Sequence, residues 1–252
     1  MYIANSTRPD IAYAVHYAAR FVAKPASQHI LAVKRVMRYL RATTEVGIVF
    51  RRCQPSDAYK ITAYADADFA GHAGDSKSTS GYIFMMGGPI TWSSRRQRLT
   101  ALSTTEAEIY ALADAAKEAV WLGNLLKDMR LMLNDNSIVI MEDNAACYAL
   151  VTGTKAPTWT KHLAVRIGFV RDLISDRTID VRRCPTTAML ADPLTKALGA
   201  TELKRKMETI VNTTMGDENC ARTSERANFK PQSAEGECQK SHPYDGERPP
   251  PV

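Results

Sequence analysis

Four acidic residues stand where the core elements of the folded chain are expected to begin or end. Asp66 ends a strand pattern, Glu108 lies in the first turn of a long helical pattern, Asp143 follows a compact apolar strand, and Asp192 begins or lies within the last helical pattern. Singly, each has a structural explanation, because acidic residues near helix starts act as caps or complement the helix dipole. Four together point to a shared site.

If the strands of Asp66 and Asp143 are neighbours, their ends coincide, and the carboxylates repel one another unless a cation neutralises them. Hard oxygen ligands suit Mg²⁺. Two such ions about 3.5–4 Å apart cleave phosphodiesters, one by activating water and the other by stabilising the leaving 3′ oxygen. We therefore predict a two-metal site with Asp66, Glu108, Asp143 and Asp192 as ligands, in which Mn²⁺ can replace Mg²⁺.

Hydrophobic periodicity predicts the elements that position these acids. Alternating apolar residues indicate three antiparallel strands within 58–94, with Arg98 to Leu102 left open as an extension of the third. The patterns that follow are a helix over 104–130, a strand over 137–141, a short helix ending at 150, a helix over 161–175, a strand over 178–182, and a helix from 187 to 210. This order predicts an α/β fold with a mixed five-stranded sheet and helices on both faces.

A small helical segment over residues 1–54 precedes the sheet, with apolar residues at helical spacing on both sides of Pro25. Two helices cannot close a core alone, so we expect the segment to pack on something else. It holds nine Lys and Arg against two acidic residues, whereas 55–212 hold nineteen against eighteen. Such a basic segment suits a polyanion such as nucleic acid. A solvated helix face is the simpler explanation of the charge alone.

Composition excludes several classes of protein. The 252 residues contain no run of 18 apolar residues and no basic start followed by an apolar stretch, so neither a membrane span nor a signal peptide is predicted. The five cysteines form no C-x-x-C pair, which favours reduced thiols in the cytoplasm or nucleus and a protein that is not secreted. Residues 211–252 are polar, poor in aromatics and end in Pro-Pro-Pro-Val, a composition typical of disorder.

Several long strings, in register, resemble the ribonuclease H domain of copia-type LTR retrotransposon polyproteins. They are YADADFAG from Tyr64, KSTSGYIF from Lys77, ITWSSRRQ from Ile90, LSTTEAEIYAL from Leu102, EDN from Glu142, TKHL from Thr160 and ADPLTK from Ala191. The resemblance covers about 58–200 and implies a ribonuclease H-like domain over 58–205. NSTRPDIAYAV from Asn5 and VKRVMRYLR from Val33 resemble the C-terminal end of the preceding reverse transcriptase domain, so 1–54 is identified with that remnant. The polymerase's own aspartates would then lie upstream of Met1.

The resemblance also selects among neighbouring acids. The family's first aspartate is followed by a small and then a polar residue, which fits Asp66 as ligand and leaves Asp68 as an auxiliary substrate contact. The family's glutamate is followed directly by an aliphatic residue, which fits Glu108. Glu106 instead completes a capping box with Ser103.

Substrate contacts follow from the same resemblance, which implies an RNA/DNA hybrid as partner. The predicted contacts are Thr104, Thr105 and Asn144, together with Arg95 and Arg96 for phosphates, in a basic cluster that includes Arg98. Many cellular members carry a histidine just before the last aspartate. Residues 183–187 contain none, and His162 is a weaker candidate for that role.

Two functions remain open. The first is a Mg²⁺-dependent endonuclease that cuts the RNA strand of RNA/DNA hybrids, acting beside an upstream reverse transcriptase domain. The second is a catalytically idle, nucleic-acid-binding remnant of a decayed element. A chain that keeps all four predicted metal ligands but cleaves no RNA/DNA hybrid would be the second, the idle remnant.

Overall fold

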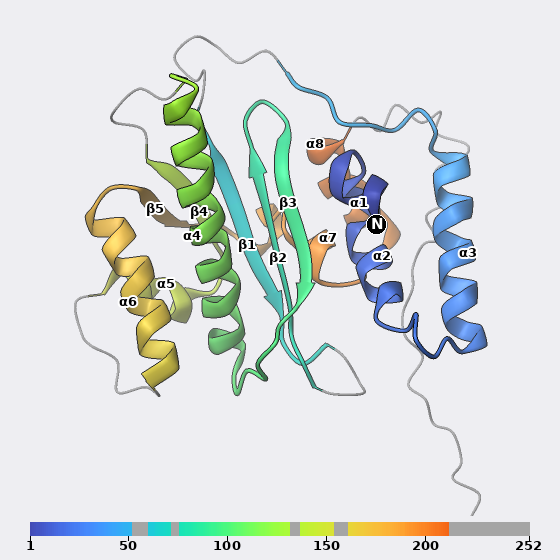
Figure 1. Ribbon diagram of the computed structural model, residues 1–252, viewed down its shortest axis with the longest axis horizontal. Coiled ribbons are helices and arrows are strands. Elements are labelled where there is room, and N and C mark those ends of the chain that lie inside the picture. Colours follow the sequence, from blue (N-terminus) through green and yellow to red (C-terminus); the bar gives the residue numbers. More distant parts are fainter. Residues whose placement is uncertain (52–59, 72–75, 132–136, 154–160, 212–252) are drawn as a thin grey trace, which may run out of the picture.

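The computed structural model describes residues 1–51, 60–71, 76–131, 137–153 and 161–211. Within them, five strands form one sheet in the order β3-β2-β1-β4-β5 (Figure 1). The strands are β1 Thr62–Asp68, β2 Thr79–Met85, β3 Pro89–Arg96, β4 Ile138–Glu142 and β5 Ile179–Arg183. The tail predicted to be disordered lies, beyond Val211, outside the described residues, as do positions 52–59 where the two predicted domains adjoin.

Strand direction determines which side chains can meet. β1 pairs antiparallel with β2, and β2 with β3, whereas β1 with β4 and β4 with β5 are parallel. The predicted mixed five-stranded sheet is therefore confirmed. Because β1 and β4 are parallel neighbours, their carboxyl ends lie at the same end of the sheet, next to Asp66 and Asp143.

The third strand, β3, lacks the extension that the sequence analysis left open. β3 ends at Arg96, so the extension over Arg98 to Leu102 is wrong. The chain must leave the sheet there to reach Ser103, the N-cap of the next helix. The Gln97 side chain holds this turn by donating hydrogen bonds to Ser80 Oγ at 2.8 Å and to the Ala107 carbonyl at 2.9 Å.

Helices cover both faces of the sheet, as predicted. They are α1 Tyr2–Ser6, α2 Ala12–Ala19, α3 Ser27–Ala42, α4 Thr104–Asp128, α5 Ala145–Thr152, α6 Lys161–Ser175, α7 Asp192–Thr195 and α8 Ala200–Ile210, with 3-10 turns η1 Pro9–Ile11 and η3 Thr186–Ala188. The helices α4, α5 and α6 lie on one side, and α1, α2, α7 and α8 on the other (Figure 1). Across the described ranges, no helix is both long and apolar enough to span a membrane.

The last helical pattern is broken rather than continuous. Sequence periodicity predicts one helix from 187 to 210, but the structure has η3, α7 and α8 in its place. Pro193 occupies the first turn of α7 and Gly199 is the extended N-cap of α8, which explains the interruptions. The break lets the short α7 place Asp192 near the end of β1, where Lys196 contacts both Asp192 and Asp66.

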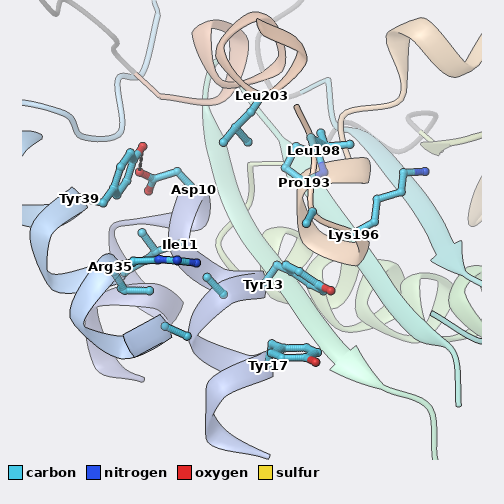
Figure 2. Close-up of a pocket in the computed structure, with 14 residues that line it drawn as sticks. Asp10, Ile11, Tyr13, Tyr17, Arg35, Tyr39, Pro193, Lys196, Leu198 and Leu203 are labelled. Atoms are coloured by element: carbon cyan, nitrogen blue, oxygen red, sulfur yellow. Dashed lines mark hydrogen bonds between the residues drawn. The ribbon is translucent and has the colours of Figure 1, made fainter. Parts of the chain in front are cut away.

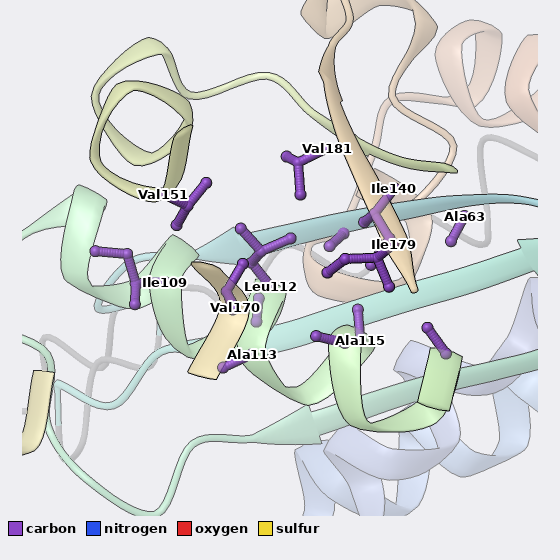
Figure 3. Close-up of a cluster of buried hydrophobic side chains, with 14 of the residues drawn as sticks. Ala63, Ile109, Leu112, Ala113, Ala115, Ile140, Val151, Val170, Ile179 and Val181 are labelled. Atoms are coloured by element: carbon purple, nitrogen blue, oxygen red, sulfur yellow. The ribbon is translucent and has the colours of Figure 1, made fainter. Parts of the chain in front are cut away.

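The main core lies between α4 and the sheet (Figure 3). β1 contributes Ala63, Ala65 and Ala67 at alternating positions, and α4 contributes a series of buried alanines that includes Ala111 and Ala115. Small side chains on both surfaces let the helix axis lie close to the strand. This close packing is what allows a glutamate on α4 to reach the carboxylates at the strand ends.

A second core covers the opposite face of the sheet and includes the first residues of the chain. Ala12 of α2 and Ile83 of β2 are both fully buried and cluster with Leu194 of α7 and residues of α8. Trp92 Nε1 donates a 2.7 Å hydrogen bond to the carbonyl of Ala4 in α1. The N-terminal helices therefore pack on this chain's own sheet.

A buried polar network connects α3 to this second layer. Arg8 is 6% exposed and pairs with Asp10 at 2.7 Å while donating to the Thr43 carbonyl at 2.9 Å. Tyr39 of α3 donates to the same Asp10 carboxylate at 2.8 Å. These bonds join both ends of the helical segment to a single ion pair.

Replacing Ala12 by aspartate tests this packing. Ala12→Asp would place an unpaired charge in the second core, which costs several kcal/mol, on the order of 3–5. Ala19→Asp, at an exposed position near the end of the same helix, should cost less than about 1 kcal/mol. Urea unfolding of both variants measures the difference, and equal stabilities would show that α2 does not pack on the sheet.

Candidate active site

Three carboxylates from three elements meet at the carboxyl end of β1 and β4. Asp66 lies in β1, Glu108 in α4, and Asp143 directly after β4. Each offers one oxygen, and these oxygens lie within 4.8 Å of one another. Asp66 and Glu108 are 2% and 6% exposed, whereas Asp143 is half-buried. Asp143 does not cap the following helix, because that role belongs to Asn144, whose Oδ1 accepts from Cys147 N.

The electrostatics of this cluster show how unfavourable it is without a cation. Burial, only partly offset by Lys196 and Thr195, raises the pKa of Asp66 to about 6. Burial and then the charges of Glu142, Asp66 and Asp143 raise the pKa of Glu108 well above its usual value. Glu108 Oε2 is buried and accepts no hydrogen bond from the described residues. A buried carboxylate oxygen without a hydrogen-bond partner, on a side chain grouped with two other carboxylates, fits a hard divalent cation.

The fourth predicted acid, Asp192, stands beside this group. The ammonium of Lys196 lies 2.6 Å from Asp192 Oδ1 and 3.6 Å from Asp66 Oδ2, so it bridges the two carboxylates. The second oxygen, Asp192 Oδ2, lies 2.6 Å from the ammonium of Lys206. Lys206 is 2% exposed and also donates to the Met189 carbonyl at 2.8 Å. Asp192 is therefore held rigidly, and its access to a metal requires the half-exposed Lys196 to move.

Gly81 of β2 allows α7 to approach the sheet. Gly81 pairs with Asp66 in the ladder, and a Cβ added there would lie 2.7 Å from Thr195 Cγ2 and 2.8 Å from Leu194 Cβ. The hydroxyl of Thr195 in turn donates a 2.5 Å hydrogen bond to Asp66 Oδ2. Because Gly81 has no side chain, α7 can lie close enough for Thr195 to contact Asp66, the first predicted metal ligand.

Asp68 lies on the same strand face as Asp66, two residues further along. Its side chain folds over Gly71, where an added Cβ would overlap the carboxylate. Burial raises the pKa of Asp68, and the charges of Lys196 and Arg20 oppose that rise. Asp68 thus borders the site but is not one of the three grouped acids.

The other predicted substrate contacts lie on three different elements, with Asn144 as the N-cap of α5. Thr104 and Thr105 occupy the first turn of α4, with Thr104 exposed. Arg95 and Arg96 are exposed at the end of β3 and line a groove of about 490 Å³ with Arg98, Lys117 and Arg166. The groove runs between β3 and α4. Its five basic residues outnumber its two acidic ones, Asp114 and Glu118, and this balance suits a polyanion.

Glu106 forms only half of the capping box predicted with Ser103, because its carboxylate accepts from the preceding residue, Leu102, in place of Ser103. Its backbone N–H donates to Ser103 Oγ at 3.1 Å, and its carboxylate accepts from Leu102 N at 2.8 Å. The same carboxylate accepts from the Tyr110 hydroxyl at 2.6 Å and contacts His162 Nε2 at 3.2 Å. His162 is therefore tied to α4 through Glu106, outside the carboxylate cluster.

Sequence reasoning missed three charged residues that shape the site. Lys196 and Lys206 give Asp192 its partners, and the spacing of Asp192 and Lys196 could have indicated an i,i+4 pair. The third is Glu142, which is fully buried and whose Oε1 accepts from Asn144 N at 3.0 Å. Strand alternation after Ile138 and Ile140 could have indicated that Glu142 faces the core.

Sequence relatives decide the family. The chain is 38% identical over 199 residues to a retrovirus-related Pol polyprotein from transposon TNT 1-94 of Nicotiana tabacum, covering 79% of this chain and 14% of that protein. It is 35% identical over 196 residues to the corresponding polyprotein from transposon RE1 of Arabidopsis thaliana, covering 77% of this chain and 13% of that protein. The chain belongs to the Pol polyprotein family of copia-type retrotransposons. This Pol-family chain thus spans about one seventh of these relatives' length.

A further relative bears a different name. The secreted RxLR effector protein 161 of Plasmopara viticola is 46% identical over 123 residues, covering 48% of this chain and 84% of that protein. Its name describes the secretion of that protein and no chemistry. No family model matches the Pol-family chain.

Among solved structures, LC11-RNase H1 in complex with an RNA/DNA hybrid aligns at a TM-score of 0.43 and 16% identity, covering 54% of this chain and 94% of that one. The foamy viral protease-reverse transcriptase in complex with an RNA/DNA hybrid aligns at 0.41 and 19%, covering 57% and 20%. Scores this low do not carry the assignment. The sheet topology of the Pol-family chain and its sequence relatives together support a ribonuclease H domain.

Gly81→Ala tests the approach of α7. The added methyl must displace Leu194 and Thr195, which should cost about 1–3 kcal/mol in the free energy of unfolding. Gly168→Ala is the matched control, because nothing lies within 4 Å of a Cβ there and alanine favours the interior of α6. Chemical denaturation of both variants is the measurement. Equal stability of Gly81→Ala and the parent would contradict the close approach.

The metal-free domain should lose stability as pH rises. Burial raises the pKa of Glu142 to about 8 and that of Asp66 to about 6, so the folded state binds more protons than the unfolded state between pH 4 and about 8. The free energy of unfolding therefore falls with rising pH, by at most about 1.4 kcal/mol per pH unit for each group. Urea unfolding in EDTA at several pH values measures this fall.

Glu142→Gln removes one of the acids whose pKa burial raises, and it should make the fall above pH 6 shallower. Asp172→Asn, at an exposed position of α6, should leave the whole profile unchanged. A parent protein whose free energy of unfolding rises between pH 4 and about 8 would contradict the raised pKa values of Asp66 and Glu142.

Proposed function

We propose that this domain is a ribonuclease H that hydrolyses the RNA strand of RNA/DNA hybrids with two divalent metal ions. The observation that carries the proposal is the grouping of Asp66, Glu108 and Asp143, with ligand oxygens within 4.8 Å, at the end of a mixed sheet. Membership of the Pol family supports a role in reverse transcription, in which the RNA template is removed. The upstream reverse transcriptase domain is the natural partner in the parent polyprotein.

Mg²⁺ is the metal we propose, with Mn²⁺ able to replace it. Asp66, Glu108 and Asp143 would hold one ion, and Asp66 with Asp192 would hold the other. When bound, such ions lower the pKa of a coordinated water and stabilise negative charge on the phosphate.

The chain's own residues perform the remaining tasks. Thr195 donates to one oxygen of Asp66 and so fixes the orientation of that carboxylate. Lys206 holds Asp192 from the buried side, which fixes the position of its other oxygen. Lys196 neutralises Asp66 and Asp192 and, once displaced from them, is placed to meet an incoming phosphate.

Binding would rely on charge and shape rather than on base sequence. The groove lined by Arg95, Arg96 and Arg98 runs along α4 from Tyr110 to Glu118, and Thr104 and Thr105 are in the first turn of the same helix. Arginines that contact phosphates fix the register of a duplex without reading its bases. The 2′-hydroxyls of one strand distinguish a hybrid from DNA.

The deciding experiment is cleavage of an end-labelled RNA/DNA hybrid in Mg²⁺ and in Mn²⁺. The parent should cut the RNA strand. Asp143→Asn should lower the rate by at least about 100-fold, because loss of a direct metal ligand exceeds the 10–100-fold cost of losing an outer partner. Asp172→Asn, a matched change at an exposed position, should cut at the parent rate.

Circular dichroism must show that all three proteins are folded. A folded parent that binds the hybrid without cutting it would favour the idle remnant over the enzyme.

A further inference from the structure

A row of aromatic side chains runs along α2 and the residues directly after it. Tyr13, Tyr17 and Phe21 follow one another at four-residue spacing, with ring centroids 5.9 and 5.4 Å apart. Arg20 lies over the Tyr17 ring at 5.3 Å. We call these four residues the α2 strip. Its rings are half-buried, so they are neither core nor fully exposed.

The α2 strip begins at the candidate active site. Arg20 Nη2 donates a 3.1 Å hydrogen bond to Thr79 Oγ1, and Thr79 is the ladder partner of Asp68. Tyr13 and Tyr17 line a cavity of about 80 Å³ together with Lys196. Figure 2 shows the two tyrosine hydroxyls on the same side as the Lys196 side chain.

The end of α2 also lies at the same end of the molecule as the carboxyl end of β1 and the start of α4 (Figure 1). A nucleic acid seated on the carboxylates could therefore continue along the strip.

The chemistry of the α2 strip suits a sugar-phosphate backbone. Burial, followed by the charge of Asp68, raises the pKa of Tyr13 to about 12, so its hydroxyl stays a hydrogen-bond donor at neutral pH. Arg20, over the Tyr17 ring, and Lys196, which lines the same cavity as Tyr13 and Tyr17, supply positive charge. Aromatic rings next to basic side chains are the means by which proteins bind nucleic-acid strands without sequence preference. From Tyr13 to Phe21 the strip spans about 12 Å, the length of roughly four nucleotides.

We propose that the α2 strip binds the sugar-phosphate backbone of the hybrid where it leaves the cleavage site. Residues preceding the sheet are then part of the substrate-binding surface. The inference rests on the proposed function for the identity of the ligand, and it adds a binding surface outside the carboxylate cluster. The competing explanation is that the α2 strip is purely structural. It would then only join α2 to α3, through the stacking of Phe21 on His29.

The test measures binding separately from cleavage. In the Asp143→Asn background, fluorescence anisotropy gives the Kd for a labelled RNA/DNA hybrid over a range of salt concentrations. Arg20→Gln and Tyr13→Phe together should raise Kd by roughly 3–10-fold and lower the salt slope by about 1, because one phosphate contact is lost. Arg20→Lys, which keeps the charge, should bind close to the parent value.

Matched controls lie in the same N-terminal segment. Arg38→Gln removes an equal charge from the exposed surface of α3, and Tyr2→Phe removes a hydroxyl from a residue that is 84% exposed. Both should bind as the parent does. Thermal unfolding of every variant identifies any change in Kd that comes from loss of folding.

Two outcomes separate this inference from the proposed function. If the chain with Asp143 intact cuts hybrids and the α2 strip variants change neither Kd nor KM, the strip is only structural and the inference is overturned. If the chain does not cut, but the strip variants still weaken binding and the controls do not, the inference stands without the enzyme. With both correct, the strip variants raise KM and leave kcat nearly unchanged.

Discussion

Mutual repulsion of buried carboxylates is the constraint on which the rest of this structure depends. Asp66, Glu108 and Asp143 are held together although the charges of Asp66 and Asp143 make the ionisation of Glu108 less favourable. Lys196 reduces this cost from the open side. Lys206 pairs with the neighbouring Asp192 from the buried side. The close packing of alanines between β1 and α4 then resists the separation that repulsion would otherwise produce.

The elements could be predicted from sequence where the hydrophobic period was long and uninterrupted. The period of α4 and the apolar run of β4 both indicated the right element, and strand ends then indicated where Asp66 and Asp143 lie. Sequence alone leaves the parallel pairing of β1 and β4 open, because no local pattern reveals which strands are neighbours. The family strings supplied the choice of Glu108 over Glu106, which periodicity alone leaves open.

What escaped prediction depends on contacts between distant parts of the chain. The break of the last helix at α7 follows from Pro193 and Gly199. That the break lets α7 pack closely on the sheet is clear only from the contact between Leu194 and Gly81 in the folded chain. The partners of Asp192 are Lys196, directly after α7, and Lys206 in α8, and the folded structure was needed to identify them. The packing of α2 on the sheet could not be foreseen either, because an apolar helix face does not specify its partner.

The second core has a consequence for the order in which the chain folds. It joins Ala12, near the beginning of the chain, to Ile83 in the middle and Ile210 at the end of α8. During synthesis, the N-terminal helices must therefore wait for almost 200 further residues before their apolar faces are covered. Contacts so distant in sequence form slowly, because a large loop must close before they contribute. The nascent chain is thus exposed to association with other chains until α8 has left the ribosome.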